Sequence, residues 1–322
     1  MNMRNAIIKQ NEQLAFEPEI IQDTLITYNT FIVSGMGGSH LAADIVQGIS
    51  PALNIIVHKD YGLPMQAFEQ TDRLFIASSY SGNTEEALDG LDTALKNNIP
   101  SCAISIGGKL IERAETEKIA YIKMPDTGIQ PRSALGFSIK ALAKIMRQEN
   151  LLQELTQLGR TLMPENFETK GKEFAYKIRD RVPLVYASSR NRAIAYNWKI
   201  KFNETGKIPS FTNVFPELNH NEMTGFDVTV SNALLSHNFT AILLRDKEDH
   251  PRIQKRMEIL AKLYSEKSIP TYTVDFEGQN RLERIFSSLY LADWIAYYTA
   301  ELYGADPNNV PMVEEFKKQM AG

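Results

Sequence analysis

The chain has 322 residues, of which 43% are hydrophobic and 23% charged, which is an ordinary globular composition at a length that favours two domains. Its formal net charge of −4 argues against a nucleic-acid-binding protein, and its single cysteine, Cys102, excludes a disulfide framework. Residues 1–14 do not resemble a secretory signal and no apolar run approaches the ~20 residues that cross a bilayer, so we expect a cytoplasmic protein without a membrane partner.

The first half of the chain alternates short apolar runs, which predict buried strands, with segments of helical periodicity. Polar-faced helices are expected over residues 3–28. The expected strands are Thr30–Val33, Asn54–Val57, Leu74–Ala77, Ser101–Ile106 and Ala120–Ile122. A long helix is predicted from Pro131 to about Leu158 and breaks near Pro164. We therefore place a domain boundary there, with domains at 1–160 and 161–322.

The order of elements repeats in the second half, which suggests two copies of one unit. The expected strands and helices are Pro183–Ala187, Ala241–Leu244 and Thr271–Val274, and Asn191–Glu204, Pro251–Ser265 and Arg281–Leu302. Strands alternating with helices of this length predict an α/β fold class, with a mostly parallel sheet flanked by helices in each domain. Ligands of such sheets bind beyond the carboxyl ends of the strands.

The stretch Ser79–Thr84 joins a predicted strand to a predicted helix that begins at Glu85. It holds the hydroxyls of Ser79, Ser81 and Thr84, with Thr84 placed to cap the helix. Neutral hydroxyls beside the N–H groups of a helix N-terminus suit one phosphate monoester. The second domain has an Arg-Asp-Lys-Glu run from Arg245 instead, so phosphate binding is assigned to the first. The alternative is an ordinary strand–turn–helix connection.

The glycine loop that begins at Gly35 resembles a dinucleotide fingerprint. The G-x-G-x-x-G pattern requires glycine at position 40, where His40 stands, although Asp60 lies downstream as such a motif requires. The competing interpretation is that Gly38 lets the backbone approach a sugar closely while Ser39 forms a hydrogen bond with it. Both interpretations remain open from these residues alone.

Glu204 ends a predicted helix immediately before Gly206, a candidate C-cap. The negative end of a helix dipole makes a carboxylate hold its proton more tightly, and this higher basicity is what a general base needs. The alternative is a solvated glutamate in a frayed last turn.

His220 lies between two asparagines whose amides could fix its tautomer, as an acid/base histidine requires, or it is a loop histidine with no task. His220 and Glu222 make only two metal ligands, and no H-x-x-x-H pair or cysteine cluster joins them, so we expect no metal site. In the last predicted helix, Met312–Met320, only one of Lys317 and Lys318 can follow the apolar face of Val313, Phe316 and Met320 inward.

Five motifs together resemble the bifunctional phosphoglucose/phosphomannose isomerases of the sugar-isomerase (SIS) domain superfamily. The matches run in the family's order over residues 35–317. They are Gly35–Ser39, Ser79–Thr84, Pro131–Gly136, Asn203-Glu204 and Asn213–Glu222. The Ser-x-Ser-Gly-x-Thr pattern alone marks the superfamily, whereas Pro-Glu-Leu-Asn-His-Asn-Glu together with Asn-Glu is far more specific.

This resemblance implies two SIS subdomains, each a flavodoxin-like three-layer sandwich, in a homodimer that needs no cofactor. It implies a metal-independent isomerase of glucose 6-phosphate and fructose 6-phosphate, with mannose 6-phosphate as a further expected substrate. Ser39, Ser79, Ser81 and Thr84 would hold the phosphate, with Gly38 close to the sugar. The catalytic roles that it implies are a proton shuttle at Glu204, ring opening by His220 of the partner subunit and by Lys317, and an enediolate contact at Arg132.

The sequence departs from the family at three places. His40–Asp44 replaces the usual Gly-Ile-x-Gly-Asp, Gly206 follows Thr205 where many members have asparagine, and Val310 stands where some members carry a threonine thought to help accept mannose phosphate. The glucose activity is therefore implied more directly than the mannose activity.

A non-catalytic sugar-phosphate-binding SIS protein would not need Glu204, His220 and Lys317. An aminosugar-phosphate synthase would need a glutaminase domain that begins with cysteine, and an NAD-dependent oxidoreductase would bind NADH.

Overall fold

The computed structural model describes residues 1–320, which form two compact units. The first unit contains Met1 and Ile8–Met163, and the second contains Asn2–Ile7 and the chain from Pro164 onward. Residues 2–7 therefore pack with the second unit, where the Arg4 guanidinium donates to the Glu168 carboxylate at 3.0 Å. Each unit has its own sheet and its own hydrophobic core.

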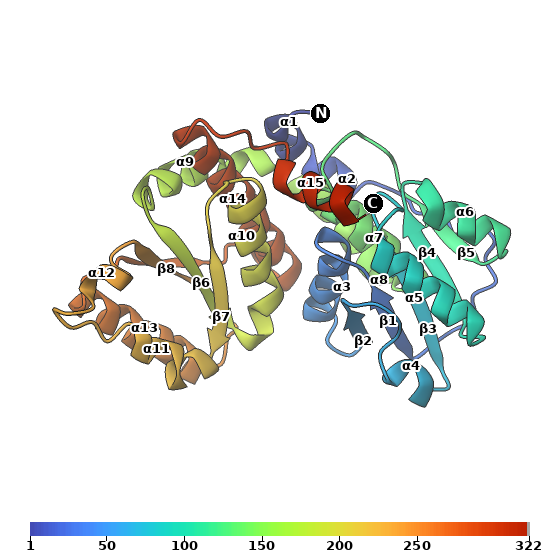
Figure 1. The fold of residues 1–322 in the computed structure, drawn as a ribbon, viewed down its shortest axis with the longest axis horizontal. Coiled ribbons are helices and arrows are strands. Elements are labelled where there is room, and N and C mark those ends of the chain that lie inside the picture. Colours follow the sequence, from blue (N-terminus) through green and yellow to red (C-terminus); the bar gives the residue numbers. More distant parts are fainter. Residues whose placement is uncertain (321–322) are drawn as a thin grey trace. The chain divides into compact units, whose positions relative to one another are not determined.

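The sheet of the first unit has five parallel strands in the order β2-β1-β3-β4-β5 (Figure 1). The strands are β1 (Thr30–Ser34), β2 (Asn54–His58), β3 (Arg73–Ser78), β4 (Ser101–Ser105) and β5 (Ala120–Lys123). Strands β1, β3 and β4 are buried over nearly their whole length, because helices cover both faces of a parallel sheet.

Helices of the first unit lie on both faces of this sheet. They are α2 (Gln10–Gln13), α3 (Gly38–Ile49), α4 (Gln66–Glu69), α5 (Glu85–Lys96), α6 (Gly108–Thr116), α7 (Leu135–Ile145) and α8 (Glu149–Thr161), with a 3₁₀ turn, η1 (Pro131–Ser133). Helix α5 buries Ala87, Leu91 and Ala94 at helical spacing, and Leu91 and Ala94 lie in one core cluster with Phe75 of β3. Strand β2 is added on one side of β1 and the strands from β3 onward on the other, so right-handed crossovers place α3 on the face opposite to α5 and α6 (Figure 1).

The sheet of the second unit has four parallel strands in the order β7-β6-β8-β9. The strands are β6 (Val182–Ser188), β7 (Phe211–Phe215), β8 (Phe239–Arg245) and β9 (Thr271–Asp275). Its β7-β6-β8-β9 order matches β2-β1-β3-β4 of the first sheet, so the two units share one topology.

The second unit also contains α-helices. They are α1 (Met3–Ile8), α9 (Glu168–Lys177), α10 (Arg192–Glu204), α11 (Glu222–Gly225), α12 (Ala233–Ser236), α13 (Pro251–Glu266), α14 (Arg281–Leu302) and α15 (Pro311–Met320), with the 3₁₀ turns η2 (Pro164–Phe167), η3 (Ser189–Asn191) and η4 (Glu217–His220). Met257, Leu260 and Tyr264 of α13 pack against one face of the second sheet (Figure 1). Helix α10 packs against β6 on the other face and also contacts α14.

Two sequence predictions about elements are wrong, and one strand was missed. The helix expected from Pro131 to Leu158 is η1 followed by α7 and α8, separated at Met146–Gln148 where Arg147 has φ +55°. The helices expected over residues 3–28 end at Gln13, and beyond them Ile21 pairs with Tyr121 in an antiparallel bridge. Strand β7 was not predicted at all.

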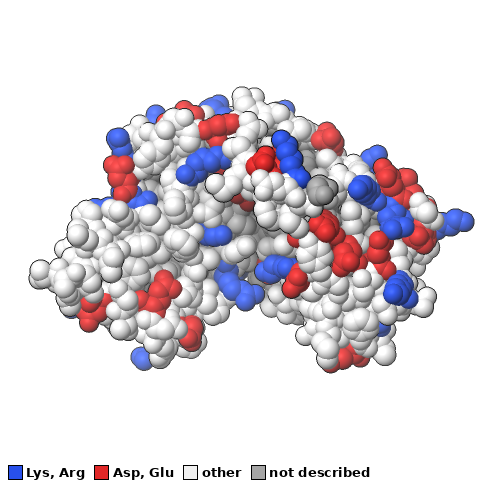
Figure 2. Space-filling view, viewed as in Figure 1, with Lys and Arg blue, Asp and Glu red and all other residues white. Residues whose placement is uncertain are grey.

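The surface carries both signs of charge. On the face drawn in Figure 2, Lys and Arg side chains are interspersed with Asp and Glu on each unit, in keeping with the net charge of −4. Within residues 1–320, no helix combines the length and the apolar character that a bilayer crossing would require.

Candidate active site

The loops that follow β1 and β3 meet at the carboxyl edge of the first sheet. The backbone N–H of Tyr80 donates to Ser39 Oγ at 3.1 Å, and Ser78 Oγ donates to the Ser39 carbonyl at 3.3 Å. Gly38, the first residue of α3, lies so close to η1 that an added Cβ would be 3.0 Å from the Pro131 carbonyl oxygen. Three segments predicted to form the site therefore converge within the first unit.

The hydroxyl of Ser79 organises the loop between β3 and α5. Its side chain is fully buried and accepts from the N–H groups of Gly82 at 3.1 Å and Thr84 at 3.4 Å. Ser79 Oγ also lies 2.7 Å from Thr84 Oγ1. Because two N–H groups occupy the lone pairs of Ser79, its O–H donates to Thr84, which leaves the Thr84 O–H to donate to a ligand.

Thr84 is the N-cap residue of α5, but its side chain makes no capping hydrogen bond, so the predicted capping role is wrong. The Thr84 hydroxyl instead contacts Ser79, and this contact stabilises the loop rather than the helix end.

Ser39 and Ser81 each accept a backbone hydrogen bond and keep a proton to donate. Ser39 Oγ accepts from Tyr80, and Ser81 Oγ accepts from the N–H of Asn83 at 3.3 Å. A hydroxyl that is already an acceptor can offer a ligand its O–H, which suits an anion. Burial raises the pKa of Tyr80 to about 12, so this neighbouring phenol brings no negative charge to the loop.

Gly82 is required by the shape of the loop. Its φ is +72°, and an added Cβ would lie 1.8 Å from the Gly107 carbonyl oxygen. Leu110 N–H donates to the Gly82 carbonyl at 2.9 Å, which attaches the loop to α6. The loop is therefore held in one conformation by the protein itself.

Arg132 lies in η1 and is 4% exposed. The turn is fixed by Gln13, whose amide donates to the Ser133 carbonyl at 2.7 Å and accepts from the Gly136 N–H at 3.0 Å. Gln13 is itself buried and precedes its partners by more than 100 residues. Sequence reasoning missed it, because nothing in a lone glutamine of a short helix signals a distant partner.

Glu204 is the last residue of α10 in the second unit and is half-buried. Two buried contacts fix this helix against α14. Lys201 Nζ lies 2.6 Å from Asp293 Oδ1, and Trp198 Nε1 donates to Ser288 Oγ at 3.0 Å.

The predicted glycine C-cap of α10 is wrong. Thr205 is the C-cap residue, and the left-handed conformation falls on Lys207, with φ +58°, rather than on Gly206. Gly206 is nevertheless tightly packed, because an added Cβ would lie 2.9 Å from the Phe202 carbonyl oxygen.

His220 is exposed at the end of η4. The amide of Asn219 accepts from Arg256 at 3.3 Å, and the amide of Asn221 donates to Glu217 at 2.7 Å. The asparagine amides therefore bind these neighbours instead of the imidazole, and the expectation that they fix its tautomer is wrong.

Lys317 lies on α15, in which none of the described residues is buried. Its Nζ is 3.5 Å from Glu314 Oε1. The expected inward-facing apolar side chains of this helix are exposed, with Phe316 at 61%.

The two units divide the predicted site residues between them. The first unit contains Gly38, Ser39, Ser79, Ser81, Thr84 and Arg132, and the second contains Glu204, His220 and Lys317.

The second sheet carries a carboxylate where the first has its hydroxyl loop. Asp246 follows β8, is fully buried, and accepts from the Glu248 N–H at 3.1 Å. Its two oxygens lie 2.5 Å from Arg281 Nη1 and 3.0 Å from Arg284 Nε. A built-in anion therefore occupies the loop that corresponds to Ser79–Thr84.

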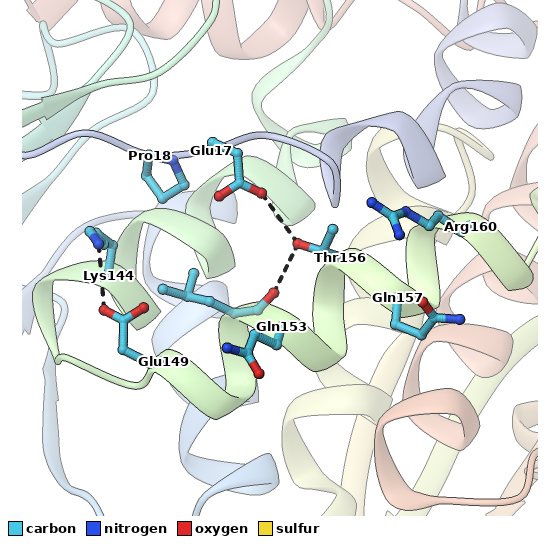
Figure 3. Close-up of a pocket in the computed structure, with 9 residues that line it drawn as sticks. Glu17, Pro18, Lys144, Glu149, Gln153, Thr156, Gln157 and Arg160 are labelled. Atoms are coloured by element: carbon cyan, nitrogen blue, oxygen red, sulfur yellow. Dashed lines mark hydrogen bonds and ion pairs between the residues drawn. The ribbon is translucent and has the colours of Figure 1, made fainter.

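A pocket of about 430 Å³ lies elsewhere in the first unit, at α8 (Figure 3). Its lining residues are Glu17, Pro18, Lys144, Glu149, Leu152, Gln153, Thr156, Gln157 and Arg160, none of them a predicted site residue. Lys144 pairs with Glu149, and Thr156 accepts from the buried Lys140 ammonium at 2.6 Å.

Within residues 1–320, no group of three or more His, Cys, Asp or Glu side chains is arranged to hold a metal ion.

Comparison with known proteins decides the family. Residues 167–320 match the model of the bacterial phospho-glucose isomerase C-terminal SIS domain. A bifunctional phosphoglucose/phosphomannose isomerase of Aquifex aeolicus is 34% identical over 95% of this chain and 94% of its own length. The relative of the same name in Caldicellulosiruptor bescii is also 34% identical, over 90% of this chain and 89% of its own. The chain belongs to the bifunctional phosphoglucose/phosphomannose isomerase family.

This membership confirms the resemblance inferred from the sequence. The α/β fold class with parallel sheets is also confirmed, by the strand pairings and by the similarity to a solved structure. The C-terminal domain of glucosamine-fructose-6-phosphate aminotransferase from Francisella tularensis superposes with a TM-score of 0.69 over 96% of this chain and 97% of that one. At 15% identity, this likeness establishes the fold alone.

Proposed function

We propose that this member of the phosphoglucose/phosphomannose isomerase family interconverts glucose 6-phosphate and fructose 6-phosphate, and that it also accepts mannose 6-phosphate. Similarity over nearly the whole chain to relatives that bear this name carries the proposal. Mannose and glucose 6-phosphates differ only at C2, so a planar enediol protonated on either face yields both.

The phosphate is held at the carboxyl edge of the first sheet. Ser39, Ser81 and Thr84 donate their hydroxyl protons to its oxygens, and Ser79 keeps the loop in shape. The N-termini of α3 and α5 start in these two loops and add backbone N–H groups and the positive end of a helix dipole. Neutral donors suit a monoester that has to be released after each turnover.

Glu204 moves the proton. Its carboxylate removes the C2 proton of the open-chain aldose, the electrons of that bond form the C1–C2 double bond of the enediol, and the C1 oxygen takes up a proton. Return of the carried proton to C1, with loss of the O2 proton, gives the ketose. The guanidinium of Arg132 stabilises the negative charge that develops on oxygen.

His220 and Lys317 assist the opening of the sugar ring, which precedes proton transfer. We place His220 in the active site of the partner subunit of a homodimer. Both side chains are exposed in the single chain, which is compatible with groups that act on a substrate.

Incubation with fructose 6-phosphate in deuterated water tests the function. Glucose 6-phosphate and mannose 6-phosphate labelled with deuterium at C2 are the expected products, followed by NMR. Transfer of the abstracted C1 hydrogen to C2 in part of the product, seen as molecules with protium at C2, fits one carboxylate that carries the proton between carbons. Binding of the sugar without any conversion would establish a non-catalytic sugar-phosphate-binding protein and refute the proposal.

A further inference from the structure

The segment that carries His220 runs from the end of β7 through η4 and α11. It is attached to the unit on either side of the histidine. Phe215 and Leu218 are fully buried before it, in the cluster that contains Tyr264 of α13. Glu222 follows two residues after it and is half-buried. An exposed histidine thus lies between two anchored points.

Glu222 forms the second anchor through both of its carboxylate oxygens. The hydroxyl of Tyr186 donates to Oε1, and the side-chain amide of Asn213 donates to Oε2 at 2.5 Å. Tyr186 of β6 and Asn213 of β7 are directly paired in the sheet. The carboxylate therefore bridges two neighbouring strands and ties the start of α11 to them.

The two donors are matched to a carboxylate. Tyr186 is fully buried, and burial raises the pKa of its hydroxyl, so the group remains protonated and keeps donating. A carboxylate accepts at both oxygens, and hydrogen bonds to a charged acceptor are about twice as strong as neutral ones. A glutamine side chain would turn an NH₂ group toward one of the two donors.

We propose that Glu222 is a positioning residue, which holds the segment 217–225 in the conformation that presents His220. Its backbone supports the same arrangement, because the Glu222 N–H donates to Asn221 Oδ1 at 2.6 Å and Asn221 in turn donates to Glu217. The catalytic consequence rests on the function proposed above for His220. The structural part does not depend on it.

Glu222→Ala, His220→Ala and the double variant test the proposal through a double-mutant cycle. When His220 is present, Glu222→Ala is expected to lower kcat/KM by about 10–100-fold, since displacing a catalytic group by about 1 Å has a cost of that order. In the His220→Ala background it is expected to lower kcat/KM by less than about twofold, because no imidazole is left to misplace. An equal loss in both backgrounds would assign Glu222 a role that does not pass through His220 and would overturn the proposal.

Amide hydrogen exchange gives a readout without substrate. Faster exchange of residues 217–225 in Glu222→Ala, with the strands unaffected, is the expected result, and unchanged exchange would refute the positioning role. If exchange accelerates while His220→Ala keeps wild-type turnover, Glu222 still holds the segment but the catalytic role of His220 in the proposed function is wrong.

Two tyrosine variants provide a matched control. Tyr186→Phe removes one donor to Glu222 and is expected to accelerate exchange of 217–225 and to lower kcat/KM about tenfold. Tyr290→Phe removes an equally buried hydroxyl, which has no hydrogen-bond partner within residues 1–320, and is expected to do neither. Equal effects of the two variants would indicate general loosening of the core and would contradict the proposal.

Discussion

Side chains in the first-unit loops differ in the hydrogen bonds that they already make. Ser79 uses its whole hydroxyl inside the protein, whereas Ser81 accepts from one N–H and keeps its proton. In the proposed function a phosphate would therefore meet donors at Ser39, Ser81 and Thr84, and the loop would not have to rearrange to expose them. This preformed geometry lowers the entropy cost of binding.

Glu204→Gln tests the proposed base. The amide keeps the size of the side chain but cannot take up a proton, so kcat is expected to fall by about 10²–10⁴-fold while substrate binding changes little. Steady-state kinetics with fructose 6-phosphate, together with a binding titration, measures both. Glu258→Gln, at an exposed position of α13, is the matched control. A Glu204→Gln enzyme with normal turnover would remove Glu204 from the mechanism.

The sequence indicated the residue types of the site better than their local contacts. The hydroxyl loop and Arg132 were predicted as site residues because strand–loop–helix patterns and family motifs mark them, and this role stays a prediction. The predicted cap at Thr84 and the amide partners of His220 were wrong, because a short polar side chain has several acceptors within reach and sequence does not rank them. Gln13 and the bridging role of Glu222 depend on contacts across strands or across the fold, which spacing along the chain does not encode.

Among the elements, α10 links the core of the second unit to Glu204. It packs on β6 and α14, and its buried Lys201–Asp293 pair, at 2.6 Å, lies one turn before the glutamate. Removing one partner of a buried pair leaves a desolvated charge, which costs more than removing both.

Asp293→Leu is therefore expected to destabilise the protein by about 3–5 kcal/mol, because it removes the carboxylate that pairs with the buried Lys201. The double variant Lys201→Met/Asp293→Leu is expected to recover most of that loss. Urea denaturation of the two variants and the wild type measures the difference. If the double variant were as unstable as the single one, packing rather than charge would dominate at this position.

Element prediction succeeded where hydrophobicity was continuous and failed where it was not. The buried strands β1, β3, β6 and β8 stand out as apolar runs. Strand β7 lies at a sheet edge, and its Thr212 and Asn213 interrupt the apolar pattern. The break between α7 and α8 falls on Arg147, which has a positive φ without being glycine, and its guanidinium is held by Asp23 at 2.9 Å. Neither feature leaves a signal in local composition.

At the scale of the whole molecule, the proposed dimer shares its active sites. If Glu204 of one subunit works with His220 of the other, each Glu204→Gln/His220→Ala heterodimer contains one intact site. Equal mixing of the two impaired variants after dissociation and reassociation should then restore roughly a quarter of wild-type activity, since half of the dimers are mixed and half of their sites are complete. Activity assays before and after mixing measure the gain. Absence of any gain in verified heterodimers would place both residues in one subunit.

The internal ion cluster around Asp246 bears on how many ligands one chain can hold. The two sheets have the same strand order, so duplication alone would create two equivalent places for an anion. In the second sheet a carboxylate from the chain itself, Asp246, pairs with Arg281 and Arg284. If the proposed function holds, we expect saturation at one equivalent of sugar phosphate per polypeptide, because the carboxylate of Asp246 takes the place of an external anion in the second sheet and only the loops of the first sheet are open to one.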